Sequence, residues 1–151
     1  MRRNEKEITD KSNIESIIQQ SLVCRLALSD NGAPYIVPLC FGYADNTLYF
    51  HCAKEGKKRE ILERNNNVCF EFDVGTEVKP GKTGCDWGMK YRSVIGFGEA
   101  FIVEDLEEKR RALEIITAQY ADQIYKFKDA ALKETLVIKV KISSMTGKHS
   151  V

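Results

Sequence analysis

The sequence predicts a small, mainly β domain, an antiparallel barrel with helices packed on its outside, over residues 1–151. Six short segments have strand-type apolar patterns, and turn-forming residues closely follow several of them, which indicates antiparallel neighbours. A few segments with helical periodicity interrupt these strands. A chain of 151 residues suits a single domain. Closure of the sheet into a barrel would remove exposed strand edges.

The first predicted elements are a helix and a strand. Residues 12–20 should form the helix, because Ser12 and Glu15 fit a capping box and isoleucines recur at helical spacing. Residues 22–28 have a strand pattern. They lead into residues 30–32, where Asn and Gly can take the positive φ angles of a tight turn.

The next two strands are predicted to continue an antiparallel meander. Residues 35–43 alternate, with the aromatic and aliphatic side chains at odd positions on one face. Pro38 lies on the other face and cannot donate a ladder hydrogen bond, which implies a sheet edge, a bulge or a ligand-facing stretch. A turn at residues 44–46 then leads to an alternating strand over residues 48–53.

The second half of the chain mixes helices, strands and one long predicted loop. Glycines and a proline in residues 77–91 predict that loop, which contains Trp87, the only tryptophan. Asp105 should cap a helix. The predicted elements are a helix over 55–65, strands over 68–74 and 93–103, a helix over 106–120 and a closing strand over 136–142.

Composition argues against several classes of partner. Lys and Arg number 23 against 22 Asp and Glu, so the chain lacks the basic excess of non-specific nucleic-acid binding. No apolar run approaches the ~20 residues of a membrane span. The N-terminal residues lack the apolar core of a signal peptide. We therefore expect a cytoplasmic protein with neither a nucleic-acid nor a membrane partner.

The cysteines are expected to be free thiols and not metal ligands. There are five, an odd number, and no C-x-x-C spacing occurs. Only two histidines could supplement them, and no pair of ligands is close in sequence, so no metal site is predicted. Cys85, in the predicted loop, is the candidate for an exposed and reactive thiol.

A basic cluster at a helix start is the strongest functional signal. Lys57, Lys58 and Arg59 lie where the helix over 55–65 begins, directly after a strand that contains His51. Helix starts carry partial positive charge and usually attract acidic residues, so cations there favour a bound anion, above all phosphate. The alternative is a solvated basic helix face.

An ordered set of motifs runs along the chain, over residues 24–27, 31–39, 48–53, 56–58, 67–71, 91–100 and 146–148. This set resembles the pyridoxamine 5′-phosphate oxidase-like flavoproteins, which share a split β-barrel, and within them the branch of Nim-type nitroimidazole-resistance proteins. No single motif is specific; their order is. The resemblance implies a six-stranded antiparallel split β-barrel with peripheral helices.

The resemblance also implies a cofactor site. FMN, with FAD as the alternative, would lie in a groove between two subunits of a homodimer. Lys57 and Lys58 would bind its phosphate, and Trp87 would cover the site from the partner subunit. His51 is the catalytic candidate, because imidazole can exchange protons with a flavin or substrate near neutral pH. The other cofactor-binding residues that the resemblance implies are Pro38, Leu39, Cys40, Phe41, His51, Cys52, Ala53, Ser93 and Val94.

These observations lead to one main hypothesis and two alternatives. The main hypothesis is an FMN-dependent oxidoreductase that reduces a small planar acceptor such as a nitroimidazole-type compound. The basic C-terminal segment that holds the substrate phosphate in true pyridoxamine phosphate oxidases is not found here, so that activity is not expected. The alternatives are a flavin carrier or redox sensor without turnover, and a barrel that holds deazaflavin or haem, with His51 as an axial haem ligand.

Overall fold

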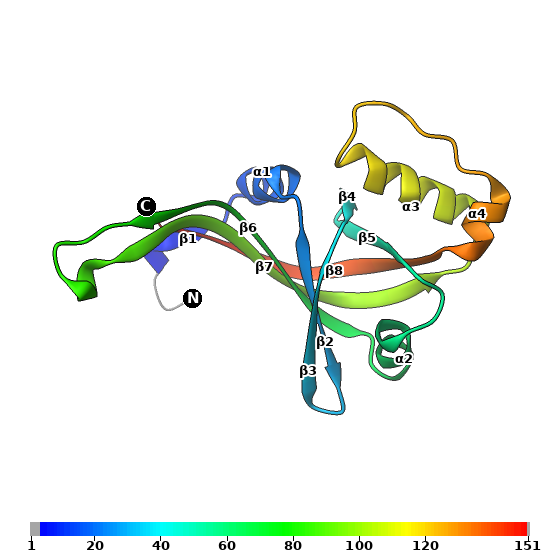
Figure 1. Ribbon diagram of the computed structural model, residues 1–151, viewed down its shortest axis with the longest axis horizontal. Coiled ribbons are helices and arrows are strands. Elements are labelled where there is room, and N and C mark those ends of the chain that lie inside the picture. Colours follow the sequence, from blue (N-terminus) through cyan, green and yellow to red (C-terminus); the bar gives the residue numbers. More distant parts are fainter. Residues whose placement is uncertain (1–3, 151) are drawn as a thin grey trace.

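One large antiparallel sheet with helices on its outside makes up the computed structural model, which describes residues 4–150 (Figure 1). The predicted mainly β architecture with peripheral helices is confirmed. Residues 1–3 and Val151, which the predicted domain also includes, lie outside the described residues. The elements are the 3₁₀ helix η1 (Asn4–Lys6), β1 (Glu7–Ile8), α1 (Lys11–Gln20), β2 (Cys24–Asp30), β3 (Ala33–Leu39), β4 (Gly42–Ala44), β5 (Thr47–Cys52), α2 (Lys57–Arg64), β6 (Asn67–Lys79), η2 (Gly84–Asp86), β7 (Gly88–Val103), α3 (Leu106–Ala118), α4 (Asp129–Glu134) and β8 (Leu136–Ser150).

The sheet has the strand order β3-β2-β6-β7-β8-β5-β4, with β1 paired to β8. β3 and β4 therefore lie at opposite ends of the strand order, although only Cys40 and Phe41 separate them in sequence. The prediction of one strand over 35–43 within a three-strand meander is wrong, because the chain crosses between the two sheet edges at this point. The division of that strand, together with β1, gives eight strands within residues 4–150 instead of six.

The sheet is split and not fully closed. The pairings in residues 4–150 join β3 only to β2 and β4 only to β5, so the two edges are connected by the chain and not by a ladder. The position of β3 at an edge explains Pro38, since an edge strand tolerates a residue that cannot donate.

Residues 77–91, predicted as a loop, form mostly a β-hairpin arm. β6 and β7 pair Glu77 with Lys90 beyond a register shift that follows Val74. The pairing resumes after this bulge, so the glycines and proline of the segment mark the tip of an arm and not the end of the sheet. Figure 1 shows this arm reaching away from the body, which carries the helices α2, α3 and α4 at its other end.

Capping side chains determine where α1 and α3 begin, and the cap of α1 differs from the predicted one. α1 begins at Lys11 because the Asp10 carboxylate accepts from the Ser12 backbone N–H (3.0 Å), so Asp10 and not Ser12 is the cap. Asp105 caps α3 as predicted, and its carboxylate accepts from the Glu108 N–H (2.9 Å). The short helix α4 was not predicted; it has only six residues, too few for a clear apolar period.

Two apolar clusters stabilise the fold. The larger one fills the inside of the curled sheet, where Phe41 and Phe72 pack with ring centroids 4.8 Å apart. The Phe70 ring lies directly on Gly96, where an added Cβ would come within 2.1 Å of Cζ, so this position requires glycine. The second cluster holds α3 and α4 against the sheet. Its buried members are Val103, Ala112, Leu113, Ile116, Leu132 and Val137.

The described residues bear on three classes of site. All five cysteines are free, as expected, and Cys85 is exposed at the arm tip. Residues 4–150 contain no group of three or more His, Cys, Asp and Glu arranged to hold a metal ion. Among the helices in the same range, none combines the length and the apolar character needed to cross a membrane.

Candidate functional site

The N-terminus of α2 is open and has no capping side chain. Gly56 is its N-cap residue, with φ of 134°, a conformation that disfavours any residue with a Cβ. The first helical hydrogen bond here runs from the Glu60 N–H to the Gly56 carbonyl (3.3 Å), so the backbone N–H groups of residues 57–59 have no helical acceptor. These N–H groups and the helix dipole form a place for an anion.

A cavity of about 90 Å³ lies at this helix start. It brings together four predicted cofactor-binding residues, Cys52, Ala53, Lys57 and Lys58. Tyr35, Glu55, Gly56 and Arg59 complete its lining. Cys52 is the last residue of β5, the strand next to the β4 edge, and Ala53 follows it, whereas Tyr35 belongs to β3 at the opposite edge of the sheet. The curl of the sheet thus places both edges beside one helix N-terminus.

The cavity lining has an excess of positive charge, because Lys57, Lys58 and Arg59 outnumber its one acidic residue, Glu55. Lys57 holds its ammonium over the Tyr35 ring, 4.6 Å from the ring centroid, and is paired with no carboxylate in residues 4–150. Lys58 has neither an ion pair nor a hydrogen bond within the same range. Arg59 differs, because it binds a carboxylate one helical turn on and a carbonyl of its own loop (2.8 and 3.0 Å). Two ammonium groups therefore remain available to an anion.

The Cys52 thiol forms part of the cavity wall. Burial raises its pKa, and the nearby Lys58 ammonium opposes this shift. A thiol with a raised pKa stays protonated at neutral pH and is a poor nucleophile. Cys52 thus contributes packing and shape to this cavity.

His51 is next to Cys52 in sequence but points to the opposite face of β5, because side chains alternate along a strand. Leu48 and Phe50 share the buried face with Cys52, while His51 is exposed. No hydrogen bond or ion pair within residues 4–150 fixes its imidazole. His51 does not line the cavity at α2, so the catalytic role predicted for it requires a substrate that reaches the outer side of β5.

The predicted flavin-lining residues around the β3–β4 crossing differ in what they expose. Pro38 and Cys40 are exposed, while Leu39 packs against the core. The Phe41 side chain is fully buried, and its N–H donates to the Tyr120 hydroxyl (3.0 Å). The Phe41 N–H is therefore already satisfied within the chain.

The structure does not bring the last three predicted residues to the α2 cavity within one chain. The Val94 side chain is fully buried in the core. Ser93 is half-buried. It pairs with Asp73 of β6, and in both strands successive side chains point to opposite faces of the sheet. Trp87 is 58% exposed and follows η2 at the arm tip, at the other end of the molecule from α2 (Figure 1). Only a second chain could bring Trp87 to that cavity.

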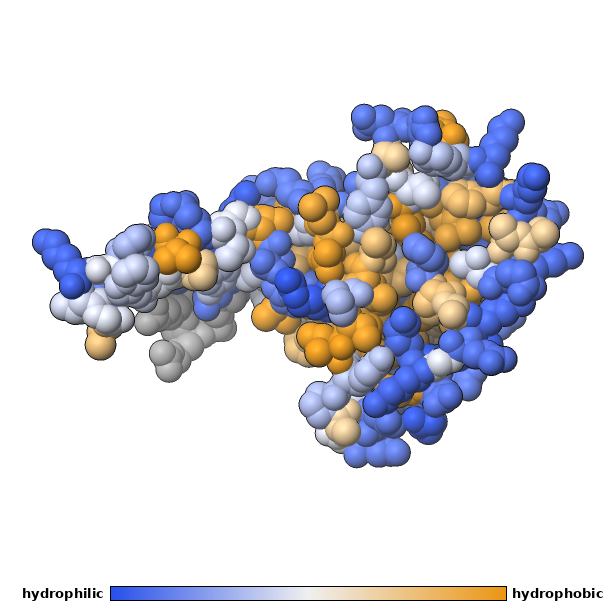
Figure 2. Space-filling view, in the orientation of Figure 1, coloured by the Kyte–Doolittle hydropathy of each residue, from blue (hydrophilic) through white to orange (hydrophobic). Residues whose placement is uncertain are grey.

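An apolar strip crosses the outer face of the sheet. The ladder registers place Ile36, Ala27, Cys69 and Phe97 side by side on four neighbouring strands. Ile95 lies two residues from Phe97 on the same face, and the exposed fractions of Ile36, Ile95 and Phe97 are 61%, 45% and 56%. Figure 2 shows apolar side chains gathered on the middle of the molecule, between charged ends. We call these five residues the outer apolar strip.

Sequence reasoning missed Tyr35 as a site residue. It assigned Tyr35 to the apolar face of a strand, and the ring does pack against the core. The same side chain reaches α2 only because β3, at one end of the strand order, and β5, next to the other end, curl towards each other. No local pattern in the sequence carries that information.

Comparison with known proteins assigns the chain to a family. The family model described as pyridoxamine 5′-phosphate oxidase matches residues 10–149. The protein therefore belongs to this family, and the predicted family is confirmed. No curated protein matches the sequence.

Solved structures agree with this assignment. A protein of Bacteroides thetaiotaomicron, provisionally described as a 5-nitroimidazole antibiotic resistance protein, is 42% identical, with a TM-score of 0.86 over 95% of this chain and 86% of its own. The flavocytochrome Anf3 of Azotobacter vinelandii is 17% identical, with a TM-score of 0.87 over 100% of this chain and 72% of its own. An FAD- and haem-binding protein of Mycobacterium smegmatis is 18% identical, with a TM-score of 0.87 over 96% and 73%. The last two share the fold.

Proposed function

We propose that this protein is an FMN-dependent oxidoreductase whose α2 cavity binds the cofactor phosphate. The observation that carries the proposal is the open N-terminus of α2, where unpaired Lys57 and Lys58 ammonium groups flank backbone N–H groups without acceptors. A phosphate monoester satisfies these donors and both charges at once. The FAD named for the Mycobacterium smegmatis neighbour is consistent with a flavin, and FAD is the alternative to FMN.

The size of the cavity supports a homodimer. Pockets that enclose drug-sized ligands measure about 300–1,000 Å³, whereas the α2 cavity measures about 90 Å³. It therefore holds one end of a flavin and leaves the ring system outside. The outer apolar strip offers a surface on which a second copy of the chain can pack and complete a groove. In that dimer, the partner arm would bring its tryptophan over the ring.

The residues of this chain have separate roles in the proposed reaction. When bound, the cofactor supplies a ring that accepts and donates electrons. Cys52 and Ala53 shape the channel beside the phosphate, and the exposed Pro38 and Cys40 line the edge of the ring site. The exposed His51 imidazole is the group proposed to exchange a proton with a bound acceptor.

We propose a small planar acceptor of the nitroimidazole type. The support is the 42% identical Bacteroides protein and its description. Reduction of a nitro compound at the expense of NAD(P)H by the isolated protein would establish turnover. Binding without turnover would instead leave a flavin carrier or redox sensor, and one intense sharp absorption band in place of two broad ones would indicate haem.

The phosphate assignment is tested by the variant Lys57→Ala/Lys58→Ala. We expect it to bind FMN about 10- to 100-fold more weakly, because charge-assisted hydrogen bonds to the phosphate are lost. Riboflavin, which lacks the phosphate, should bind equally well to the variant and the wild type. Fluorescence titration measures both affinities.

The matched control for this experiment is Lys126→Ala/Lys128→Ala, which removes the same charge from an exposed stretch before α4. Its FMN affinity should equal that of the wild type. Undiminished FMN binding by the Lys57/Lys58 variant would overturn the proposed phosphate site. The proposed function itself would be overturned if the wild-type protein left FMN fluorescence unchanged and FMN left the melting temperature of the protein unchanged.

A further inference from the structure

We propose that Tyr35 is a positioning residue for the cofactor phosphate: its ring holds the Lys57 ammonium at the α2 cavity and so favours phosphorylated flavins. This inference rests on the proposed function. It adds a residue of β3, remote in sequence from the basic cluster, to the machinery of that site.

The Tyr35 ring is itself held firmly. On β3 it lies opposite Leu28 of β2, and it packs against the main apolar core. It also lines the cavity at α2. A ring fixed by the sheet on one side thus presents its face to a lysine that would otherwise be free in solvent.

Lys57 needs such a support more than its neighbours do. It is the first residue of α2 and is exposed, so its long side chain samples many rotamers. Ordering that side chain when phosphate binds opposes binding. Contact at 4.6 Å from the ring centroid restricts the ammonium beforehand. Arg59 is already ordered by its own hydrogen bonds, and Lys58 is half-buried.

A purely structural role for Tyr35 makes different predictions. If the ring only covers the core, its loss should weaken all flavins equally, or unfold the protein. The hydroxyl has no hydrogen-bond partner in residues 4–150, so removal of the hydroxyl alone should leave the fold unchanged. The ring and its lysine can therefore be separated from the hydroxyl by substitution.

The test is a double-mutant cycle with Tyr35→Leu and Lys57→Met, read out as FMN and riboflavin affinity by fluorescence titration. Tyr35→Leu should weaken FMN about two- to fivefold, the effect of one exposed cation–π contact. The same substitution in the Lys57→Met background should change FMN affinity no further. Riboflavin affinity should stay constant throughout, and Tyr35→Phe, which keeps the ring, should bind FMN like the wild type.

The outcomes distinguish a failure of the role proposed for Tyr35 from a failure of the proposed function. Equal losses of FMN and riboflavin affinity, or an undiminished effect of Tyr35→Leu in the Lys57→Met background, would overturn the role of Tyr35 while leaving the phosphate site in place. If the wild type binds no FMN, both fall together. Circular dichroism and thermal melting check that Tyr35→Leu folds, and Tyr35→Met replaces it in the cycle if it does not.

Discussion

Tyr120 stabilises the segment in which the chain crosses between the two sheet edges. Its hydroxyl accepts from the Phe41 N–H and donates to the Leu22 carbonyl, both at 3.0 Å. Its ring meets Phe41 edge-on, with centroids 6.4 Å apart. One side chain after α3 thus fixes both the segment just before β2 and the β3–β4 crossing, where we place the edge of the flavin ring.

This geometry predicts a pH-dependent effect of Tyr120→Phe. Burial raises the pKa of Tyr120 to about 12, although the Phe41 N–H opposes the shift. The folded state therefore keeps the phenol proton where the unfolded chain has lost it. The stabilising contribution is complete below about pH 10 and is lost as pH rises through about 12.

The measurement is urea unfolding of the wild type and Tyr120→Phe at about pH 8 and about pH 11. At the lower pH the variant should be less stable by about 1 kcal/mol, because two hydrogen bonds are lost. At the higher pH the difference should shrink. A difference that is the same at both pH values would show that the hydroxyl does not titrate as proposed.

At the residue scale, charge was predictable and contact was not. The basic residues at the start of α2 stand out in the sequence because cations are unusual at a helix N-terminus. The opposite directions of His51 and Cys52 also follow from strand alternation alone. The contact of Tyr35 with Lys57 does not follow, since it joins two elements that only the curl of the sheet brings together.

At the scale of elements, α3 is the helix that holds the second cluster in place. Three of its side chains are buried there. Its backbone also approaches β4 so closely that a Cβ on Gly42 would lie 2.7 Å from the Ile115 carbonyl carbon. The position of α3 therefore controls β4 and, through Tyr120, the crossing before it.

The variant Asp105→Ala tests the cap of this helix. Loss of the carboxylate that accepts from the Glu108 N–H should lower the free energy of unfolding by about 1 kcal/mol. Asp122→Ala is the control, because Asp122 is exposed in the loop after α3 and should have an effect near zero. Chemical denaturation measures both, and equal stabilities of the two variants would contradict the capping role.

Elements with a strong local signal were predicted, and those set by pairing were not. The cap of α3 and the turns at Asn31 and Asp45, both with positive φ, were visible in the sequence. The β6–β7 arm was not, because its strands pair across a bulge and contain turn-forming residues. The division of residues 35–43 was missed because alternation continues across the crossing.

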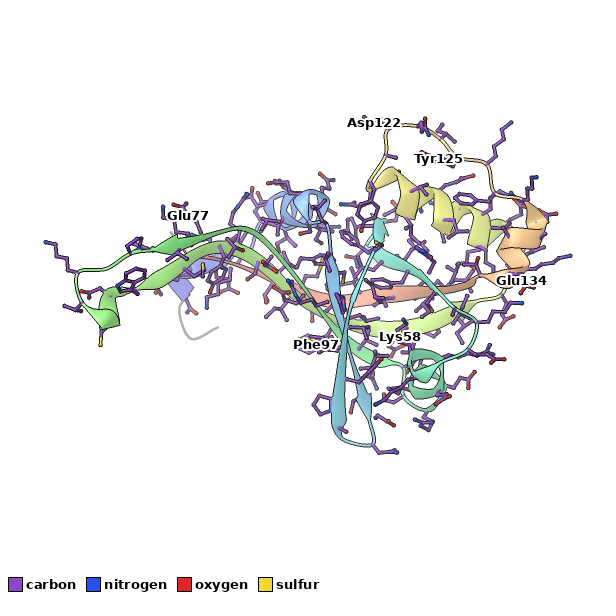
Figure 3. All side chains as sticks on the ribbon, viewed as in Figure 1. Lys58, Glu77, Phe97, Asp122, Tyr125 and Glu134 are labelled. Atoms are coloured by element: carbon purple, nitrogen blue, oxygen red, sulfur yellow. The ribbon has the colours of Figure 1, made fainter. Side chains whose placement is uncertain are left out.

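At the scale of the whole molecule, the outer apolar strip and the arm face outward, and no segment within residues 4–150 covers them. Figure 3 shows Phe97 and Lys58 on the same side of the long strands, away from Asp122 and Tyr125. A second copy that packs on Phe97 would therefore approach the side that carries the α2 cavity. Dimer formation and flavin binding should be coupled.

The variant Phe97→Glu tests this coupling. A charge placed at the β7 end of the strip should raise the dimer dissociation constant about 30-fold or more and weaken FMN binding with it. The control Ile124→Glu replaces a residue that is 90% exposed in the loop after α3. Analytical ultracentrifugation with FMN titration distinguishes the cases, and a Phe97→Glu protein as dimeric as the control would refute the interface.

The sequence by itself determined the strand patterns, the turns, the Asp105 cap and the basic helix start, and the order of its motifs already indicated the family. These features depend on neighbouring residues, so local physics is enough to specify them. Only the tertiary structure decided that β3 and β4 end opposite edges of a split sheet, that Tyr35 meets Lys57, and that Trp87 lies far from the cavity at α2. Those facts depend on which distant strands pair and how the sheet curls, and alternation along a strand is the same whichever partner it finds.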